Sequence, residues 1–287
     1  MTAPVDAPSS SMTGTITASD APGRRRRWRV RDVVPVLAAA LLFVLIWQAI
    51  VVVGDYPRFI LPGPLVVGER FVSGWSQGVI GPHFVTTLSE VVLGLLVGGT
   101  AGILTGILLA RSMLASRLLS PYIVAAQATP ILALAPLIAL WFGTGLASRL
   151  LICALICYFP IAVGTMVGIR SVDPRLVELG RSLRATRWQI LSRIEVPSAL
   201  PQILGGLRIG VTLAVVGAIV AEWAGGDQGL GVLINLARGS MFDIPLMFAT
   251  LLTIALLGVV LYLAVVAVEG RLTGARVPGS RAGRSTS

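Results

Sequence analysis

Long apolar runs alternate with short polar segments along most of this chain. A helix that crosses a bilayer needs about 20 consecutive apolar residues. Six runs that meet this length lie at about residues 33–53, 84–110, 118–142, 150–169, 199–221 and 246–268. The pattern predicts an all-α, polytopic membrane protein with about six transmembrane helices.

The composition agrees with this prediction, because 55% of the 287 residues are hydrophobic, 13% are charged and the mean hydropathy is +0.87. Water-soluble domains of this size are more polar. We expect a disordered, basic tail over residues 1–32, a transmembrane domain over 33–270 and a second tail over 271–287. The first tail has no short apolar core before a small-residue cleavage site, so we expect no cleaved signal peptide.

The distribution of positive charge predicts the orientation in the membrane. The chain has no lysine, so its 23 cationic side chains are all arginines. Arginines beside a span are retained on the cytoplasmic side. All except Arg58, Arg70, Arg149 and Arg238 fall in segments that share one side with both termini. We therefore predict cytoplasmic termini. Because these arginines lie beside spans in contact with membrane lipid, we expect no nucleic-acid partner.

The second run carries a glycine at every fourth position, which opens a groove of backbone along one helix face. The residues are Gly94, Gly98, Gly102 and Gly106. We expect this stripe to serve close packing of another helix. The alternative is a lining role in a pore.

Polar residues and prolines interrupt the third run. Pro121, Pro130 and Pro136 free backbone carbonyls at membrane depth, and Gln127 and Thr129 add groups that hydrogen-bond. These features favour a translocation pathway that includes Gln127, Thr129 and Pro130. The alternative is a set of ordinary proline kinks.

A second candidate for the pathway follows the fifth run. Glu222 and Trp223 open a glycine-rich turn that continues to Gly231 and also carries Asp227. Two carboxylates and an aromatic ring at the outer end of a span suit contact with a solute. A loop that seals the outer gate, or that docks a receptor, is the other interpretation.

The sequence offers no residues for catalysis, a cofactor or a metal ion. His83 is the only histidine, and no triad can form around it. Cys153 and Cys157 lie four residues apart, which predicts apolar packing on one helix face rather than a metal site or a disulfide. A nucleotide-hydrolysing phosphate loop needs a lysine, which this chain lacks. We therefore expect a non-catalytic subunit that another chain powers.

The one long internal polar segment spans residues 173–197. Asp173 and Pro174 are typical of a helix N-cap and first helical position. A second amphipathic piece begins after Thr186, and we expect Val196 and Pro197 to end it before the fifth span. Two short helices should then lie across the cytoplasmic face.

This segment resembles the EAA loop of importer permeases of the ATP-binding cassette (ABC) class. The resemblance rests on Glu178-Leu179-Gly180, the spacing to position 184, and Ile194-x-Val196-Pro197 after nine more residues. It covers about residues 84–270. Further short motifs resemble the nitrate, sulfonate and taurine branch of these binding-protein-dependent permeases, namely Leu61-Pro62-Gly63-Pro64, Gln127-Ala128-Thr129-Pro130, Trp141-Phe142-Gly143 and Gly229-Leu230-Gly231.

The resemblance implies that residues 173–197 form a coupling helix that inserts into an ATPase subunit. The residues implied in this contact are Glu178, Leu179, Gly180, Arg184, Ala185, Ile194 and Pro197. It also implies two ATPase subunits, a second permease copy in a homodimer or a paralogue in its place, an extracytoplasmic binding protein, and a bacterial plasma (inner) membrane. Arg184 departs from the usual glycine, so the bend would lack the left-handed residue that glycine allows. Leu179 and Gly180 replace two alanines.

The nature of the solute is less constrained. Carboxylates in the outer segments outnumber the outer arginines, so no cationic funnel for nitrate or a sulfonate is visible. The Glu222-Trp223 turn is similar to members associated with pyrimidine thiamine precursors or riboflavin. An ATP-driven importer of such a heterocycle is the prediction, with a sulfonate, taurine or nitrate permease as the alternative. An ion-coupled secondary transporter, the alternative of another class, should show inverted repeats and midplane carboxylates.

Overall fold

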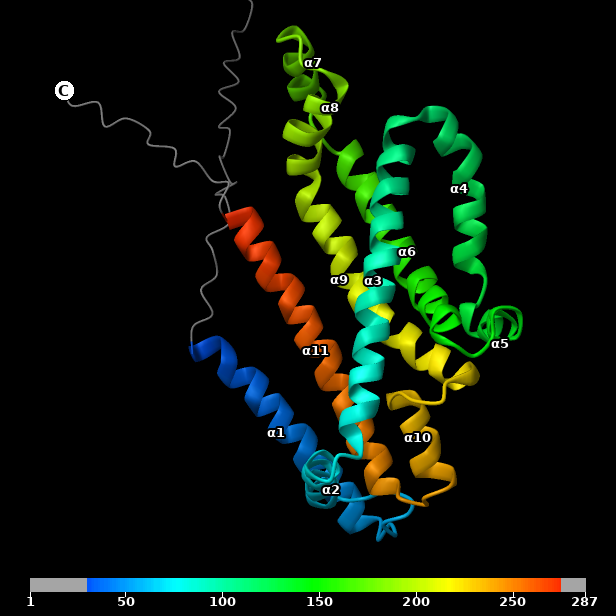
Figure 1. Ribbon diagram of the computed structural model, residues 1–287. Helices are drawn as coiled ribbons and strands as arrows, with labels where there is room; N and C mark the ends of the chain where they lie inside the picture. The colour runs from blue at the N-terminus through cyan, green and yellow to red at the C-terminus, as the bar shows by residue number, and fades with distance from the viewer. Residues whose placement is uncertain (1–29, 275–287) are drawn as a thin grey trace, which may run out of the picture. The chain divides into compact units, whose positions relative to one another are not determined.

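The computed structural model describes residues 30–274, where helices and short connections make up the chain (Figure 1). The first helices are α1 (Val30–Val53), α2 (Pro64–Ser76), α3 (Ile80–Arg111), α4 (Met113–Ala128), α5 (Ile131–Phe142) and α6 (Leu146–Arg170). A polar segment then holds α7 (Pro174–Ser182), α8 (Arg187–Ile190) and the π-helical turn η1 (Leu191–Glu195). The last helices are α9 (Val196–Gly225), α10 (Leu230–Gly239) and α11 (Ile244–Gly274).

Both predicted tails lie largely outside the described residues. Helix α1 begins at Val30, inside the range expected for the first tail, and α11 continues to Gly274, past the expected end of the last span. The chain divides into two compact units, residues 1–47 and 48–287. The described part of the first unit is the start of α1, where the rings of Phe43 and Trp47 lie 6.4 Å apart.

The centre of the second unit is the packing of α3, α6 and α9 against one another (Figure 1). Close approach is possible because glycines of α3 face the backbone of α6. A Cβ atom on Gly98 would overlap the carbonyl oxygen of Ala154, and one on Gly106 would lie 2.6 Å from that of Ala162. The buried residues at this junction are Val91, Cys153, Cys157, Ile161, Ala214, Val215 and Ala218.

Five helical stretches of the described residues are long and apolar enough to cross a membrane. They are Val34–Val53, Ile80–Arg111, Leu146–Arg170, Arg187–Gly225 and Ile244–Leu272. The all-α polytopic fold is therefore confirmed. The third predicted span, residues 118–142, is however two helices, α4 and α5. The break falls at Thr129 and Pro130, because the residue before a proline is pushed out of the helical region and Thr129 has ψ 126°.

The expected helix end at Val196 and Pro197 was wrong. The chain runs as one continuous helical stretch from Arg187 to Gly225. Pro197 has no N–H to donate, and the widened turn η1 comes just before it. In this turn the N–H of Val196 donates to the carbonyl of Leu191, five residues back. The second part of the polar segment, from Arg187, and the following span therefore form one continuous helix.

Candidate coupling segment and translocation pathway

The polar segment 173–197 begins with a well-capped helix. The side chain of Asp173 accepts a hydrogen bond from the N–H of Arg175 at 2.9 Å, and Pro174 occupies the first helical position. Both features start α7 where the sequence predicts it. The capped start fixes where the segment leaves the end of α6.

Helix α7 ends in a tight, left-handed turn at Arg184, where φ is 57°. The N–H of Arg184 donates to the carbonyl of Arg181 at 2.9 Å, and the N–H of Ala185 donates to that of Gly180 at 3.0 Å. These two bonds form the C-terminal motif that usually contains glycine. The left-handed residue that the bend was expected to lack is therefore present, as an arginine in a conformation that costs an L-residue about 1–2 kcal/mol.

The next turn starts at once, with a reciprocal cap. The N–H of Gln189 donates to the hydroxyl of Thr186 at 3.2 Å, and the N–H of Thr186 donates to the side chain of Gln189 at 2.8 Å. Gly180 is buried against this second piece, because a Cβ atom there would lie 2.9 Å from Cδ1 of Ile194. Helices α7 and α8 therefore form a compact helical hairpin.

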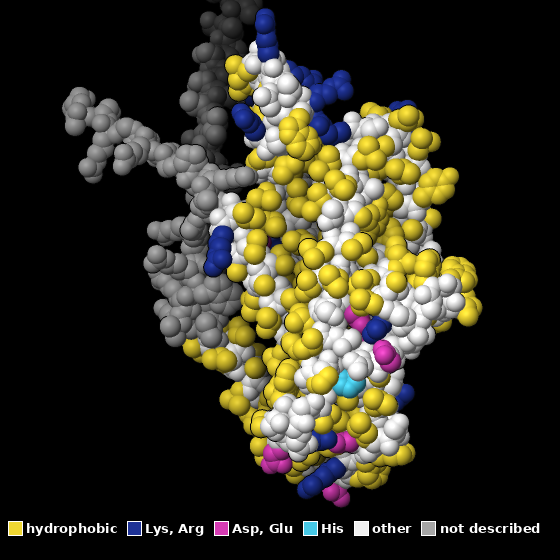
Figure 2. Space-filling view, in the orientation of Figure 1, with side chains coloured by type: hydrophobic (Ala, Val, Ile, Leu, Met, Phe, Trp, Pro, Cys, Tyr) yellow, Lys and Arg dark blue, Asp and Glu magenta, His cyan; other side chains and the backbone are white. Residues whose placement is uncertain are grey.

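The outer surface of this hairpin is apolar and basic. Leu183 and Trp188 are 74% and 72% exposed, and Glu178, Leu179 and Arg184 are exposed beside them. A shallow hollow of about 310 Å³ lies on the hairpin, lined by Leu176, Leu179, Gly180, Leu183, Arg193, Ile194 and Ser198. Figure 2 shows arginine side chains around α7 and α8. Exposed apolar side chains on a rigid hairpin suit insertion into the groove of another protein.

Arginines at the ends of two spans join α3 to the hairpin and α6 to α3. Nε of Arg111, the last residue of α3, lies 3.3 Å from the carboxylate of Glu195. Nη2 of Arg111 also donates to the carbonyl of Arg187 at 3.1 Å. Arg170, the last residue of α6, donates to the carbonyl of Leu109 at 2.8 Å. The ends of α3 and α6 are thus joined, and α3 holds α8 and η1.

The opposite end of the bundle contains a buried ion pair. Glu90 of α3 is fully buried, with 0% exposure, and its carboxylate accepts from Nη1 of Arg149 at 2.6 Å. The same nitrogen donates to the carbonyl of Gln228 at 3.3 Å, and Nη2 lies 3.5 Å from Asp227. A buried charge is costly unless it is paired, and this pair meets that need through one Glu90 oxygen, while Oε2 of Glu90 and Nε of Arg149 are buried without a hydrogen-bond partner among the described residues. The pair ties α3 and α6 to the loop before α10.

A second buried carboxylate holds the first turn of α10. Glu222, only 2% exposed, accepts from the N–H of Gly231 and from the hydroxyl of Thr87, each at 2.5 Å. The Thr87 oxygen accepts from the N–H of Leu230 at 2.8 Å, and Nδ1 of His83 lies 3.0 Å from the nitrogen and 2.9 Å from the carbonyl oxygen of Gly229. These acceptors satisfy the N–H groups that a helix N-terminus leaves free. We call Thr87, Glu90, Arg149 and Glu222 the buried polar cluster.

The break between α4 and α5 borders a cavity of about 480 Å³. Its lining residues are Gln127, Thr129, Ile131, Ile156, Phe159, Pro160, Val163, Leu213 and Val216. The Thr129 hydroxyl donates to the carbonyl of Ala125 at 3.0 Å. The Gln127 amide has no hydrogen bond to another described residue. Gln127 and Thr129 are both exposed, so the Gln127 amide is available to hydrogen-bond water or a solute at this cavity.

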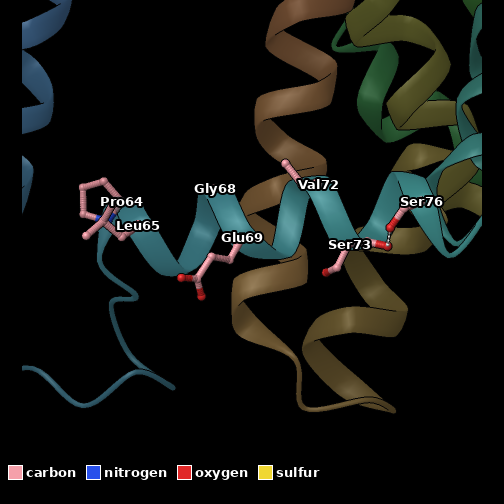
Figure 3. A pocket seen from close by; sticks show the side chains of 7 residues that line it. All are labelled: Pro64, Leu65, Gly68, Glu69, Val72, Ser73 and Ser76. Atoms are coloured by element: carbon pink, nitrogen blue, oxygen red, sulfur yellow. Dashed lines mark hydrogen bonds between the residues drawn. The ribbon is translucent and has the colours of Figure 1, made fainter.

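A further hollow, of about 560 Å³, lies along α2 (Figure 3). All seven lining residues, Pro64, Leu65, Gly68, Glu69, Val72, Ser73 and Ser76, belong to that helix. Within the group, Ser76 donates to the carbonyl of Ser73 at 3.1 Å. One face of a single helix does not enclose a solute, so this surface is not a candidate site.

Comparison with known proteins decides the family. The protein family described as the binding-protein-dependent transport system inner membrane component matches residues 98–274, more than half of the chain. The chain belongs to this family. It is therefore a permease subunit of an ABC importer, a multi-pass membrane protein, and membership implies an ATPase and a substrate-binding protein as partners. The family also excludes the alternative of an ion-coupled secondary transporter.

Several relatives cover most of this permease. The riboflavin transport system permease protein RibX of Chloroflexus aurantiacus is 43% identical over 222 residues, 77% of this chain and 82% of that protein. The formylaminopyrimidine transport permease protein ThiX of Halalkalibacterium halodurans is 35% identical over 232 residues, 81% of this chain and 92% of that protein. The putative aliphatic sulfonates permease SsuC of Bacillus subtilis is 34% identical over 218 residues, 76% of this chain and 77% of that protein.

The fold also matches solved permeases. A chain of the methionine ABC transporter MetNI, in an inward-facing conformation, superposes with a TM-score of 0.55 at 19% identity. The match covers 66% of this permease and 92% of that chain. This likeness supports the fold alone.

The residues predicted for the pathway of this permease do not share one cavity. Gln127 and Thr129 line the cavity at the helix break, whereas Glu222 and Trp223 lie in or beside the buried polar cluster. Nε1 of Trp223 donates to the carbonyl of Gly231 at 2.9 Å, and half of the side chain is exposed. The Glu222 carboxylate is occupied by partners inside the protein, so its contact with a solute would need those bonds to open.

Sequence reasoning missed the pairing of Arg111 with Glu195 at the hairpin end of the bundle and the pairing of Glu90 with Arg149 at the other end. One signal was available for each pair. Glu195 is a carboxylate in the apolar stretch that ends the coupling segment, and Glu90 lies inside an apolar run. A charge in a membrane span requires a partner, and arginines at the ends of other spans were the candidates.

Proposed function

We propose that this permease carries a small, flat heterocycle, such as a pyrimidine thiamine precursor or a flavin, across a bacterial plasma membrane with both termini in the cytoplasm. The observation that carries the proposal is the cavity at the α4–α5 break, where Phe159 offers an aromatic ring and Gln127 an unpartnered amide. A ring that stacks and an amide that bonds suit a heterocycle. The similarity to the riboflavin and formylaminopyrimidine permeases supports the same class.

A sulfonate, taurine or nitrate is the second candidate for the solute, because the putative sulfonate permease SsuC is 34% identical to this permease. The charges of this permease favour the heterocycle over an anion. Arg149 is paired with Glu90, and Nε of Arg70 donates to Asp243 at 2.7 Å. Two of the four arginines assigned to the outer side are thus neutralised and cannot attract an anion.

ATP hydrolysis by partner subunits drives the transport in this proposal, and residues 173–197 receive the motion. Glu178, Leu179 and Arg184 are exposed and make direct contact with the ATPase. Gly180 is buried and Ile194 is half-buried, so these two shape the hairpin from within. Ala185 and Pro197, also half-buried, keep its turn and its junction with α9. Two permease copies and two ATPase subunits complete the transporter.

The continuous helix from Arg187 to Gly225 carries this motion through the membrane. Its 39 residues span about 58 Å at the helical rise of about 1.5 Å per residue. One end lies in the coupling hairpin and the other presents Glu222 to α10. ATP shifts the permease between inward- and outward-facing states only if the hairpin meets open and closed ATPase dimers differently. The helix then moves both ends together.

Uptake into proteoliposomes tests the substrate class. We would reconstitute the permease with its ATPase and binding protein and compare labelled riboflavin, formylaminopyrimidine and taurine. The proposal expects uptake of one heterocycle and none of taurine. Replacement of Gln127 by leucine should lower that uptake about tenfold, because one hydrogen bond in an apolar site is lost. ATP-driven taurine uptake without heterocycle uptake would overturn the substrate class and leave the transport function intact.

A further inference from the structure

A second cavity lies between the coupling hairpin and the ends of α3 and α6. It has a volume of about 830 Å³ and is lined by Ala110, Arg111, Ile169, Val177, Arg181, Ala185, Arg187, Ile190 and Glu195. These residues come from α3, α6, α7, α8, η1 and the turn after α7. The cavity shares no lining residue with the one at the α4–α5 break, and Glu178, Leu179 and Arg184, proposed above to contact the ATPase, do not line it.

The charges that line this cavity are not balanced. Arg111 pairs with Glu195, so these two side chains neutralise each other. Arg181 and Arg187 also line the cavity, and their guanidinium groups make no ion pair or side-chain hydrogen bond with another described residue. Two unpaired guanidinium groups at one cavity attract an anion, and their planar forks match the oxygens of a phosphate group.

The apolar lining residues of this cavity and its location at the ends of the spans indicate which class of ligand it suits. Ala110, Ile169, Val177 and Ile190 make part of the lining apolar. The candidate membrane spans of α3 and α6 end at Arg111 and Arg170, so the cavity adjoins the level at which a bilayer presents its headgroups. Basic pockets at span ends bind anionic phospholipid headgroups.

We propose that this cavity binds a phosphate group between Arg181 and Arg187, supplied by an anionic phospholipid of the surrounding leaflet. Arg181 belongs to α7 and Arg187 to α8, so one bound phosphate joins the two arms of the hairpin. The hairpin is then held more firmly against the ends of α3 and α6. The bound lipid thereby raises the fraction of the hairpin's movement that is transmitted to the spans. This consequence rests on the coupling role proposed above, whereas the binding itself does not.

The binding test uses the full permease alone, in nanodiscs and after delipidation. Nanodiscs would contain phosphatidylcholine with a small fraction of phosphatidylglycerol, and native mass spectrometry would measure the lipid that stays bound. The variants are Arg181→Gln, Arg187→Gln and both together. Arg175→Gln is the matched control, because Arg175 lies on α7 and does not line the cavity. Circular dichroism would check that every variant keeps its helix content.

We expect the wild type and Arg175→Gln to retain phosphatidylglycerol in preference to phosphatidylcholine. Each cavity substitution should weaken that retention about fivefold, as expected for one arginine at an anionic surface. Inorganic phosphate added to the delipidated protein separates the two sources. Thermal stabilisation by phosphate, with no preference for phosphatidylglycerol, would overturn the lipid as the source.

Two results would overturn the site itself. One is equal lipid retention by the wild type and the double variant, with no stabilisation by phosphate. The other is an effect of Arg181→Gln and Arg187→Gln that occurs only when the ATPase is present, which would make these arginines contacts of the ATPase. Loss of ATP-driven uptake with normal lipid retention would instead concern the coupling role alone, so the two proposals fail in distinguishable ways.

Discussion

The coupling hairpin and the buried polar cluster lie at opposite ends of the same long helix and are built in contrasting ways. The hairpin depends on backbone caps and turns, and it leaves Leu183 and Trp188 exposed. The cluster buries Glu90 and Glu222 and bonds both to groups from other helices. A surface that receives a partner must keep its side chains available, whereas charge inside a membrane protein must be paired. The cluster therefore holds structure, whereas the hairpin keeps side chains exposed, as its proposed contact with the ATPase requires.

The largest expected effect concerns the buried pair of the cluster. Arg149→Leu leaves Glu90 buried without its cation, so the free energy of unfolding should fall by about 3–5 kcal/mol. Reversible unfolding in detergent, followed by circular dichroism, would measure the loss. Combining Arg149→Leu with Glu90→Leu should restore most of it, because no unpaired charge remains. A single variant as stable as the wild type would show that the pair does not hold this end together.

A smaller loss is expected where α3 meets α6. Gly98→Ala places a Cβ atom against the carbonyl of Ala154, and backbone cannot move aside cheaply, so stability should fall by about 1–3 kcal/mol. Gly258→Ala in α11 is the matched control, since nothing lies within 4 Å of its Cβ position. That control should be neutral or slightly stabilising. Equal effects of the two changes on the midpoint of thermal unfolding would contradict close packing at Gly98.

The tie between the hairpin and α3 should matter more for coupling than for stability. Glu195→Gln removes the charge that Arg111 faces and so weakens the link by about 1 kcal/mol. In proteoliposomes, the solute transported per ATP hydrolysed should fall about fivefold while the protein stays folded. Arg175→Gln, which removes a charge from the same segment without touching this link, should leave the ratio unchanged. A normal ratio in Glu195→Gln would remove the tie from the mechanism.

The smallest effect is expected at the left-handed turn. Arg184→Gly relieves the cost of φ 57° and should stabilise the hairpin by about 1 kcal/mol. Amide hydrogen exchange at Ala185 should then slow about fivefold. Arg187→Gly, at the first residue of α8, should have the opposite sign because glycine weakens a helix. Faster exchange in Arg184→Gly would mean that the arginine side chain contributes more than its strained backbone costs.

The sequence predicted what depends on composition and local pattern. The apolar runs gave the membrane class, and the capping residues at Asp173 and Pro174 gave the start of α7. Local rules failed where the outcome depended on backbone geometry. The hydropathy pattern joins residues 118–142 into one run, because hydropathy contains no information on the backbone conformation that Pro130 imposes on Thr129. The helix continues through Pro197 because a widened turn precedes this proline. No residue type in the sequence predicts such a turn.

The candidate site was predictable at one end and not at the other. The coupling segment is contiguous, so its motif and spacing could be read directly. The buried polar cluster joins Glu90 to Arg149 across 59 residues and Glu222 to Thr87 across 135. Such pairs follow from the packing of α3, α6 and α9, which the sequence of any one helix does not specify. Glu222 was therefore predicted to face the pathway, and its bonds to α10 were missed.

The contact between the coupling hairpin and the ATPase is the central claim, and stimulated ATP hydrolysis tests it most directly. The wild-type permease would be compared with Glu178→Ala and Gly180→Arg, each co-purified with the ATPase and reconstituted in lipid. Glu178 is exposed, so its replacement leaves the fold intact. We predict that both substitutions lower co-purification or stimulated turnover about tenfold or more. Circular dichroism should show unchanged helix content in Glu178→Ala, whereas Gly180→Arg also places a side chain against Ile194 and disturbs the packing of the hairpin. Wild-type co-purification and turnover in both variants would contradict the assignment of residues 173–197 as the coupling segment.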